Sequence, residues 1–86
     1  MPTISTFYGI SIRMYFDDHP PPHLHAVYNG LTAQFDLQTG EVIEGKLPKT
    51  ATRLVKEWIA LHRDALVANW ERAEQGLQLE RVEGLR

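Results

Sequence analysis

The dipeptide Asn29-Gly30 is the feature that most constrains the fold, because it stands between two runs that alternate apolar and polar residues. Both residues tolerate the positive φ of a type I′ turn, so Asn-Gly in this setting predicts a β-hairpin with a two-residue loop. The expected strands cover residues 23–28 and 31–37. Because the loop has two residues, the turn also fixes the register of the two strands.

That register can be tested against the hydrophobic pattern of the two strands. One face would carry the apolar pairs Tyr28/Leu31, Ala26/Ala33 and Leu24/Phe35. The opposite face would carry the mostly polar pairs Val27/Thr32, His25/Gln34 and His23/Asp36. Turn chemistry and side-chain pattern therefore agree, which is typical of a sequence that specifies a single structure.

Further strands are expected on both sides of this hairpin. Alternation of apolar and polar residues over 10–16 predicts one, with Arg13 and Tyr15 on its polar face. Gln38-Thr39-Gly40 predicts a turn, and residues 41–44 a short strand or sheet edge. The sequence thus predicts an antiparallel meander before residue 46.

The second half of the chain has the period of a helix from about residue 48 to 75, with no Gly or Pro after Pro48 until Gly76. A straight helix of that length would span roughly 40 Å, although a domain of this size has a radius of gyration of only about 12 Å. We therefore expect a kink near Arg63-Asp64 or a protruding end. The expected apolar stripe consists of Ala51, Leu54, Val55, Trp58, Leu61, His62, Ala65 and Leu66.

These elements predict one α+β domain over residues 1–86. It would be a small antiparallel β-meander of three to four strands, packed against a long or kinked C-terminal helix. The strands would lie within about residues 4–45, the helix within about 48–75, and an extended tail over 76–86. At 86 residues the chain is too short for a multi-domain enzyme.

The amino-acid composition excludes several kinds of functional site. The chain has no cysteine, which excludes disulfides, thiolate metal sites and a cysteine nucleophile. No apolar run is long enough for a membrane span and no export signal is recognisable, so we expect a soluble, cytoplasmic protein without membrane contact. The net charge of −2 gives no general argument for nucleic-acid binding.

The positive charges are nevertheless concentrated at the predicted start of the helix. Four bases occur there before any acid intervenes, namely Lys46, Lys49, Arg53 and Lys56. Cations are unfavourable at a helix N-terminus, where the dipole prefers anions, so a bound RNA backbone or an acidic partner protein would explain them. The alternative is an ordinary solvated helix face.

Three of the four histidines lie in one short segment, His19 to His25, which includes three consecutive prolines. Residues two apart on a strand project to the same side, so His23 and His25 should share the polar face. Such a pair suits general acid and base catalysis, including metal-independent cleavage of RNA. In that hypothesis Asp36 orients His23, Arg13 stabilises the phosphorane, and His19 is a further candidate. The alternative is a pair of solvent-facing strand histidines.

A metal site formed by His19, His23 and His25 is a weaker alternative. A straight proline run would place His19 about 12 Å from His23, so convergence would require a turn, for which a cis-proline is one route. We therefore expect no cofactor. His62 falls within the apolar helix stripe and is expected to be a core or boundary residue.

Short motifs occur along the whole chain, at Met1–Ile4, Phe7–Ile10, Ile12–Tyr15, Asp18-His19, Pro22–His25, Gly45–Pro48, Leu54–Trp58, His62-Arg63 and Asn69-Trp70. In this combination they resemble an uncharacterised bacterial family, domain of unknown function 4160. The resemblance covers essentially the whole sequence. Pro20 is an additional residue before the usual two prolines, and Leu24 stands where an aromatic residue is common.

This resemblance implies a bacterial protein of the kind that is commonly suggested to be the toxin of a type II toxin–antitoxin pair. The partner that the resemblance implies is a small cognate antitoxin-like protein. The histidines and the basic cluster make RNA a further expected partner, and the short chain favours self-association as a homodimer. The family motif points to Asp18, His19, His23, His25 and His62 without assigning their roles. A non-catalytic binding module, which would use the polar sheet face to engage a partner protein, is the competing hypothesis.

Overall fold

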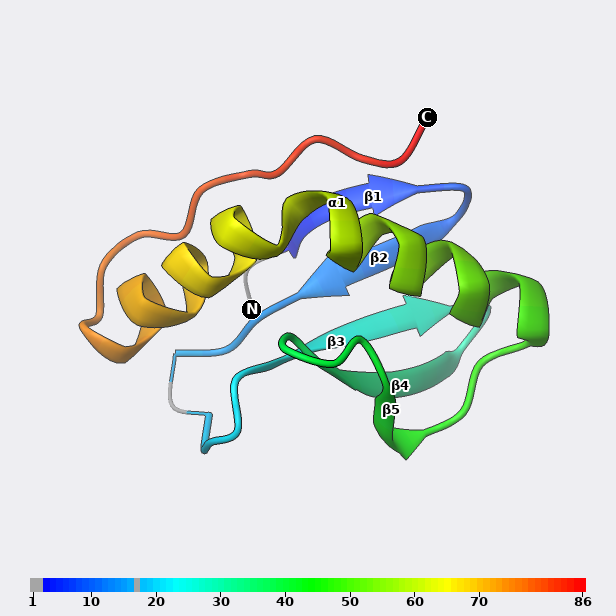
Figure 1. Ribbon diagram of the computed structural model, residues 1–86, viewed down its shortest axis with the longest axis horizontal. Coiled ribbons are helices and arrows are strands. Elements are labelled where there is room, and N and C mark those ends of the chain that lie inside the picture. The colour runs from blue at the N-terminus through cyan, green and yellow to red at the C-terminus, as the bar shows by residue number, and fades with distance from the viewer. Residues whose placement is uncertain (1–2, 17) are drawn as a thin grey trace.

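The computed structural model describes residues 3–16 and 18–86 and has one sheet and one long helix. Five antiparallel strands follow one another in chain order across the sheet. The single helix lies across one face of the sheet (Figure 1). The elements are β1 (Thr3–Phe7), β2 (Ile10–Arg13), β3 (His23–Tyr28), β4 (Leu31–Asp36), β5 (Val42–Gly45) and α1 (Lys49–Glu74).

The hairpin of β3 and β4 has the predicted register at all six pairs, from Tyr28 opposite Leu31 to His23 opposite Asp36. Asn29 and Gly30 have φ of 48° and 79°, as a type I′ turn requires. Leu24, Ala26, Ala33 and Phe35 are buried, so the apolar face is the one that faces the core. The α+β prediction is confirmed.

The strand count is five rather than three to four, because β1 was not recognised as a separate strand. A bulge between Thr3 and Ser5 shifts the pairing of β1 with β2, and both Ile4 and Ser5 are buried. A bulge interrupts the two-residue period from which strands are predicted. The turn to β2 also has positive φ at both Tyr8 and Gly9, and tyrosine is an unusual residue for that conformation.

Helix α1 is kinked at His62, where φ is −122° and ψ is 23°. A straight helix of its 26 residues would be about 39 Å long, whereas the longest dimension of the molecule is 33 Å. Just past the kink, Arg63 Nε donates a hydrogen bond to the carbonyl of Leu37, the residue that follows β4, at 2.9 Å. The kink keeps both halves of the helix within the fold.

The buried face of α1 differs in part from the predicted stripe. Leu61 was expected on that stripe but is 69% exposed, and Ala65 is exposed as well. Ile59 is buried instead. Beyond the kink the buried residues are Leu66, Asn69, Trp70 and Ala73. The buried residues on both sides of the kink follow one helical stripe, through Val55, Leu66 and Ala73, and Leu61 and Ala65 lie beyond its edge.

The tail after α1 runs back beside the helix towards β1 (Figure 1). The backbone N–H of Val82 donates to the carbonyl of Ile4 at 2.8 Å, and Val82 is buried. Trp58 Nε1 donates to the carbonyl of Glu83 at 2.7 Å. The side chain of Asn69 exchanges two hydrogen bonds with the backbone of Glu80, at 2.8 and 2.9 Å. The predicted extended tail is thus held against α1 and β1 by hydrogen bonds, and it contributes Val82 to the core.

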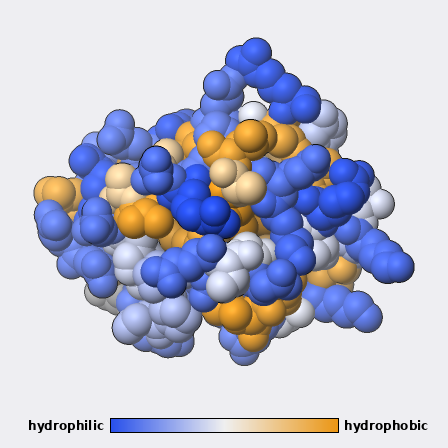
Figure 2. All heavy atoms as spheres, in the orientation of Figure 1, coloured by the Kyte–Doolittle hydropathy of each residue, from blue (hydrophilic) through white to orange (hydrophobic). Residues whose placement is uncertain are grey.

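Apolar residues on the surface seen from the helix side form separate patches divided by hydrophilic side chains (Figure 2). Within residues 3–16 and 18–86, no helix has the length and apolar character needed to cross a membrane.

Candidate metal centre

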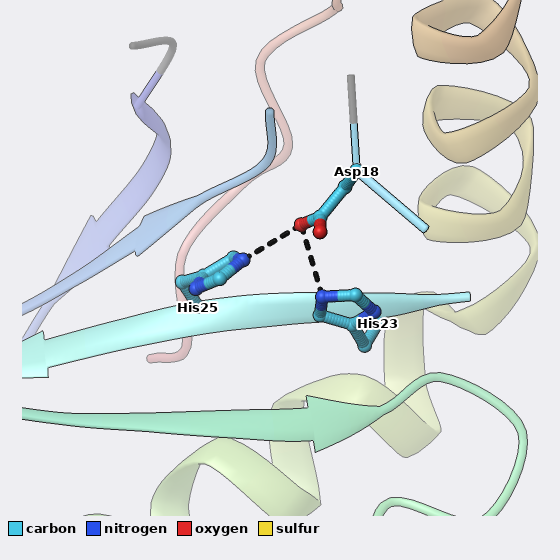
Figure 3. Close-up of side chains that lie close together, drawn as sticks. All are labelled: Asp18, His23 and His25. Carbon is cyan, nitrogen blue, oxygen red and sulfur yellow. Dashed lines mark hydrogen bonds and ion pairs between the residues drawn. The ribbon is translucent and has the colours of Figure 1, made fainter. Parts of the chain in front are cut away.

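Asp18 lies between two imidazoles at the start of β3. Its Oδ2 atom is 2.9 Å from His23 Nε2 and 2.8 Å from His25 Nε2 (Figure 3). His23 and His25 are two residues apart on one strand, so their side chains share a side of the sheet. The segment between β2 and β3 brings Asp18 over that side. A carboxylate and two imidazoles therefore converge as predicted for the histidines, but with Asp18 as their acidic partner.

His23 is held from several directions and is only 1% exposed. Its ring lies 5.3 Å from the ring of Trp70, which comes from the far half of α1. Its Nδ1 atom is 2.7 Å from the carbonyl oxygen of Pro21. A carbonyl only accepts hydrogen bonds, so Nδ1 carries the hydrogen and donates it. This contact fixes the ring orientation and the tautomer of His23.

The other ring nitrogen, His23 Nε2, is buried without a hydrogen-bond partner among the described residues. It lies close to Asp18 Oδ2, but its ring N–H direction does not satisfy hydrogen-bond geometry towards that oxygen. In the neutral Nδ1–H tautomer this nitrogen presents a lone pair to a carboxylate oxygen. Two lone pairs at that distance require a cation between them, either a proton on Nε2, whose charge then lowers the pKa of Asp18, or a metal ion.

His25 is less buried, with 18% of its side chain exposed. Its Nε2 atom makes a proper hydrogen bond with Asp18 Oδ2 at 2.8 Å, and the Tyr15 ring meets the His25 ring edge-on with centroids 4.4 Å apart. Burial alone would raise the pKa of Asp18. The hydrogen bond with His25 and the charge of His23 outweigh burial and hold the pKa of Asp18 below its ordinary value. Asp18 is therefore a carboxylate over the physiological range.

The three side chains fit the requirements of a divalent transition metal. One donor atom from each residue lies within 4.8 Å of the other two. Tetrahedral ligands about 2.0–2.1 Å from zinc are about 3.3 Å apart, so the two contacts made by Asp18 need to lengthen by only a few tenths of an ångström. The bond from His23 Nδ1 to a backbone carbonyl is the usual outer-shell support for a histidine ligand.

His19 lies at the rim of this centre. Its backbone N–H donates to Asp18 Oδ1 at 3.1 Å, and its Nδ1 is 3.5 Å from the same oxygen. Its ring centroid is 5.8 Å from that of His23, but its side chain is 83% exposed. The peptide bond between Pro20 and Pro21 is cis. His19 is therefore adjacent to the three-residue cluster without being part of it.

Asp36 does not have the role predicted from its position. It is opposite His23 in the register, as expected, but its Oδ1 accepts the backbone N–H groups of Gln38 and Thr39 at 2.7 and 3.0 Å. These bonds close the turn that follows β4. The carboxylate that contacts His23 comes from Asp18 instead, and the expectation of two solvent-facing histidines is corrected by the burial of His23.

The predicted basic cluster lies at the opposite end of the molecule, where α1 begins (Figure 1). Lys49, Arg53 and Lys56 line a shallow cavity of about 530 Å³ above the buried Leu47. Arg53 contacts Glu57 at 3.5 Å and Lys56 contacts Glu41 at 3.2 Å. Lys46 is exposed on the segment before the helix. These bases are not brought together with the histidines, whereas Arg13 pairs directly with His25 across β2 and β3.

Two residues of the centre were not predicted from strand geometry. Asp18 precedes the proline run and belongs to no strand, so no periodicity locates it; its only signal was its place in the family motif. Trp70 was expected in a core or interface, but its contact with His23 depends on the course of the helix beyond the kink. His62, as expected, is a boundary residue, half-buried with its ring 5.5 Å from that of Trp58.

Fold and site together define a small α+β protein that gathers two histidines and one aspartate at one end of an antiparallel sheet. A comparison with protein-family models matches residues 9–71 to the family described as Domain of unknown function (DUF4160). The match covers most of the chain, so the protein belongs to this family. Searches of the curated proteins and of the solved structures found no significant match.

Proposed function

We propose that this chain binds one divalent transition-metal ion through Asp18, His23 and His25, and that zinc suits the site best. The observation that carries the proposal is the buried Nε2 atom of His23, which faces the Asp18 carboxylate and has no hydrogen-bond partner within residues 3–16 and 18–86. Imidazole and carboxylate donors suit zinc and also ferrous iron. An ion at His25 Nε2 would displace the hydrogen from that atom, so the neutral ring would have to carry its hydrogen on Nδ1 instead.

With three protein ligands, a bound ion would keep a further coordination position, and the partial exposure of His25 and Asp18 favours access to it from solvent. A divalent ion with an open position polarises a bound water or a substrate oxygen, which is the basis of metal-assisted hydrolysis. In this proposal His23 fixes the ion from the protein interior. Asp18 supplies the negative charge, and Tyr15 supports the His25 ring from the side.

A chelator competition titration tests this proposal. The EDTA-treated full chain should bind one zinc ion, while Asp18→Asn, His23→Gln and His25→Gln should each bind it at least about a hundred-fold more weakly, since losing only an outer-shell partner costs 10–100-fold. His62→Gln is the matched control because it removes an imidazole outside the centre. Parallel titrations with ferrous iron, under nitrogen, establish the metal preference. Zinc affinity that is equal in all folded variants would refute the site.

Cleavage of RNA by a toxin-like protein remains a prediction from the sequence and the family resemblance. His23 is buried, so a direct acid–base role for the pair is less favoured than a metal-centred one. Induced expression of the wild type and of His23→Ala/His25→Ala, with growth and RNA integrity as readouts, tests this prediction. Arrest with RNA loss in the wild type only, in folded proteins, would support it. RNA loss that persists in metal-free lysate would favour the metal-independent route.

A further inference from the structure

We infer that the metal centre recognises a phosphate group, with Arg13 as its second anchor. This inference rests on the metal site proposed above. It concerns the class of ligand that the centre takes. The relevant residues are neighbours on adjacent strands, because Arg13 of β2 pairs with His25 of β3.

The pairing places both side chains on the same side of the sheet. Directly opposed residues in an antiparallel pair have Cβ atoms about 5 Å apart, so the Arg13 side chain begins beside the His25 ring. Arg13 is half-buried rather than fully extended into solvent. Within residues 3–16 and 18–86, Arg13 has no carboxylate within ion-pair distance. Its guanidinium therefore has no internal partner among these residues.

The charge of the centre favours an anionic ligand. A divalent ion held by one carboxylate and two neutral imidazoles has a net charge of +1, and the neighbouring guanidinium adds another positive charge. The nearest acid on β4, Asp36, is committed to the turn amides of Gln38 and Thr39. An anion at the open metal position would thus be attracted from two sides.

Among biological anions, phosphate matches this pair of groups best. A guanidinium presents planar donors that bind two phosphate oxygens at once. A third oxygen remains available for the metal. The same two-point arrangement suits the phosphate of a free phosphate monoester and the phosphodiester of an RNA strand. Tyr15, beside His25, offers an aromatic surface on the same side of the sheet.

The basic residues at the start of α1 do not supply this anchor. Lys49, Arg53 and Lys56 surround a cavity at the other end of the fold, and two of them face carboxylates there. The sequence left open whether Arg13 or the basic start of the helix would hold phosphate, and the structure places these residues at different ends of the fold. Arg13 is the only one of the predicted phosphate-binding residues that is paired with a residue of the centre.

A cobalt-substituted protein provides the test, because cobalt has visible transitions whereas zinc has none. The full chain is loaded with Co²⁺ and titrated first with inorganic phosphate and then with a dinucleoside monophosphate of RNA. We expect added phosphate to change the cobalt spectrum of the wild type. In Arg13→Gln the phosphate affinity should fall at least about ten-fold. Arg53→Gln is the matched control and should keep the wild-type phosphate affinity.

The outcomes separate this inference from the metal proposal. Cobalt binding is measured before phosphate is added, and Arg13→Gln should retain it within about two-fold, since Arg13 is not a ligand. If cobalt fails to bind the wild type, both proposals fail. If cobalt binds but phosphate affinity is equal in wild type and Arg13→Gln, or is unchanged without metal, only the phosphate inference is overturned. Tighter binding of the dinucleotide than of inorganic phosphate identifies an RNA strand as the source of the phosphate group. Tighter binding of inorganic phosphate identifies a phosphate monoester. A loss of affinity in Arg13→Gln, in either titration, supports Arg13 as the second anchor.

Discussion

The two ends of the helix illustrate different consequences of clustering polar residues. At the start of α1, four bases lie close in the sequence, yet their cations remain at the surface and two of them face acids. At the far end, residues from a loop, a strand and the helix bury His23 and leave one of its nitrogens without a hydrogen-bond partner among the described residues. The bases that are close in the sequence therefore form an ordinary solvated surface. The residues that converge in space instead bring together nitrogen and oxygen atoms that can bind a metal ion.

The largest effect in this comparison is expected from Trp70→Ala. Trp70 is buried and packs on His23, so its removal should lower the free energy of unfolding by about 3–5 kcal/mol. Zinc affinity should also fall about ten-fold, because the His23 ring loses a support that orients it. Urea unfolding and zinc titration measure the two effects. Trp70→Phe keeps an aromatic ring and should recover most of both. Unchanged zinc affinity in a folded Trp70→Ala protein would show that the helix does not position His23.

Zinc should stabilise the wild type strongly. At a free concentration 100 times the dissociation constant, a ligand that binds only the folded state adds about 2.7 kcal/mol. For a domain of this size this corresponds to a rise in Tm of about 10 °C or more. Thermal unfolding followed by circular dichroism measures the shift. Asp18→Asn should show almost none of it, while Lys49→Gln, at the other end of the helix, should keep all of it. An equal shift in both variants would locate the zinc elsewhere.

A smaller effect is expected from His19→Ala. His19 is exposed and its polar contacts are with Asp18 Oδ1, the oxygen that does not face His23 and His25, so zinc affinity should fall about three-fold or less. The same competition titration used for the ligand variants measures this change. A loss as large as that of His23→Gln would instead make His19 a fourth ligand and close the position proposed for substrate.

The smallest effect is expected at the basic end, from Lys56→Gln. The ion pair with Glu41 is exposed on both sides, so its loss should change the free energy of unfolding by less than about 1 kcal/mol. Unfolding at low and high salt tests this, since added salt should remove most of the difference. A larger loss of unfolding free energy that does not depend on salt would mean that this ion pair is a buried structural contact. The start of the helix would then no longer differ from its far end as a solvated surface.

The parts of the structure that the sequence predicted are those set by local rules. The β3–β4 hairpin follows from a two-residue turn and the alternation around it, and its whole register is as predicted. The helix follows from its period. Strand β1 escaped prediction because a bulge breaks its alternation. The burial of Leu61 was predicted wrongly because the buried face of the helix is centred on Val55, Leu66 and Ala73, which leaves Leu61 on the exposed side.

The centre was predictable only in part, for a physical reason. His23 and His25 share a strand, so their proximity follows from strand geometry. Asp18 reaches them through an irregular segment, and no local rule predicts where such a segment places a side chain. The register correctly put Asp36 beside His23, but it could not reveal that the turn amides of Gln38 and Thr39 would occupy that carboxylate.

Zinc-edge X-ray absorption of the zinc-loaded full chain tests the central claim most directly, because it reports the atoms bound to the ion. The structure predicts a four-coordinate shell at about 2.0–2.1 Å, with the outer scattering of two imidazole rings, and the loss of one ring in His23→Gln. A shell of oxygens without imidazole scattering, or a spectrum that His23→Gln leaves unchanged, would contradict a metal centre at Asp18, His23 and His25.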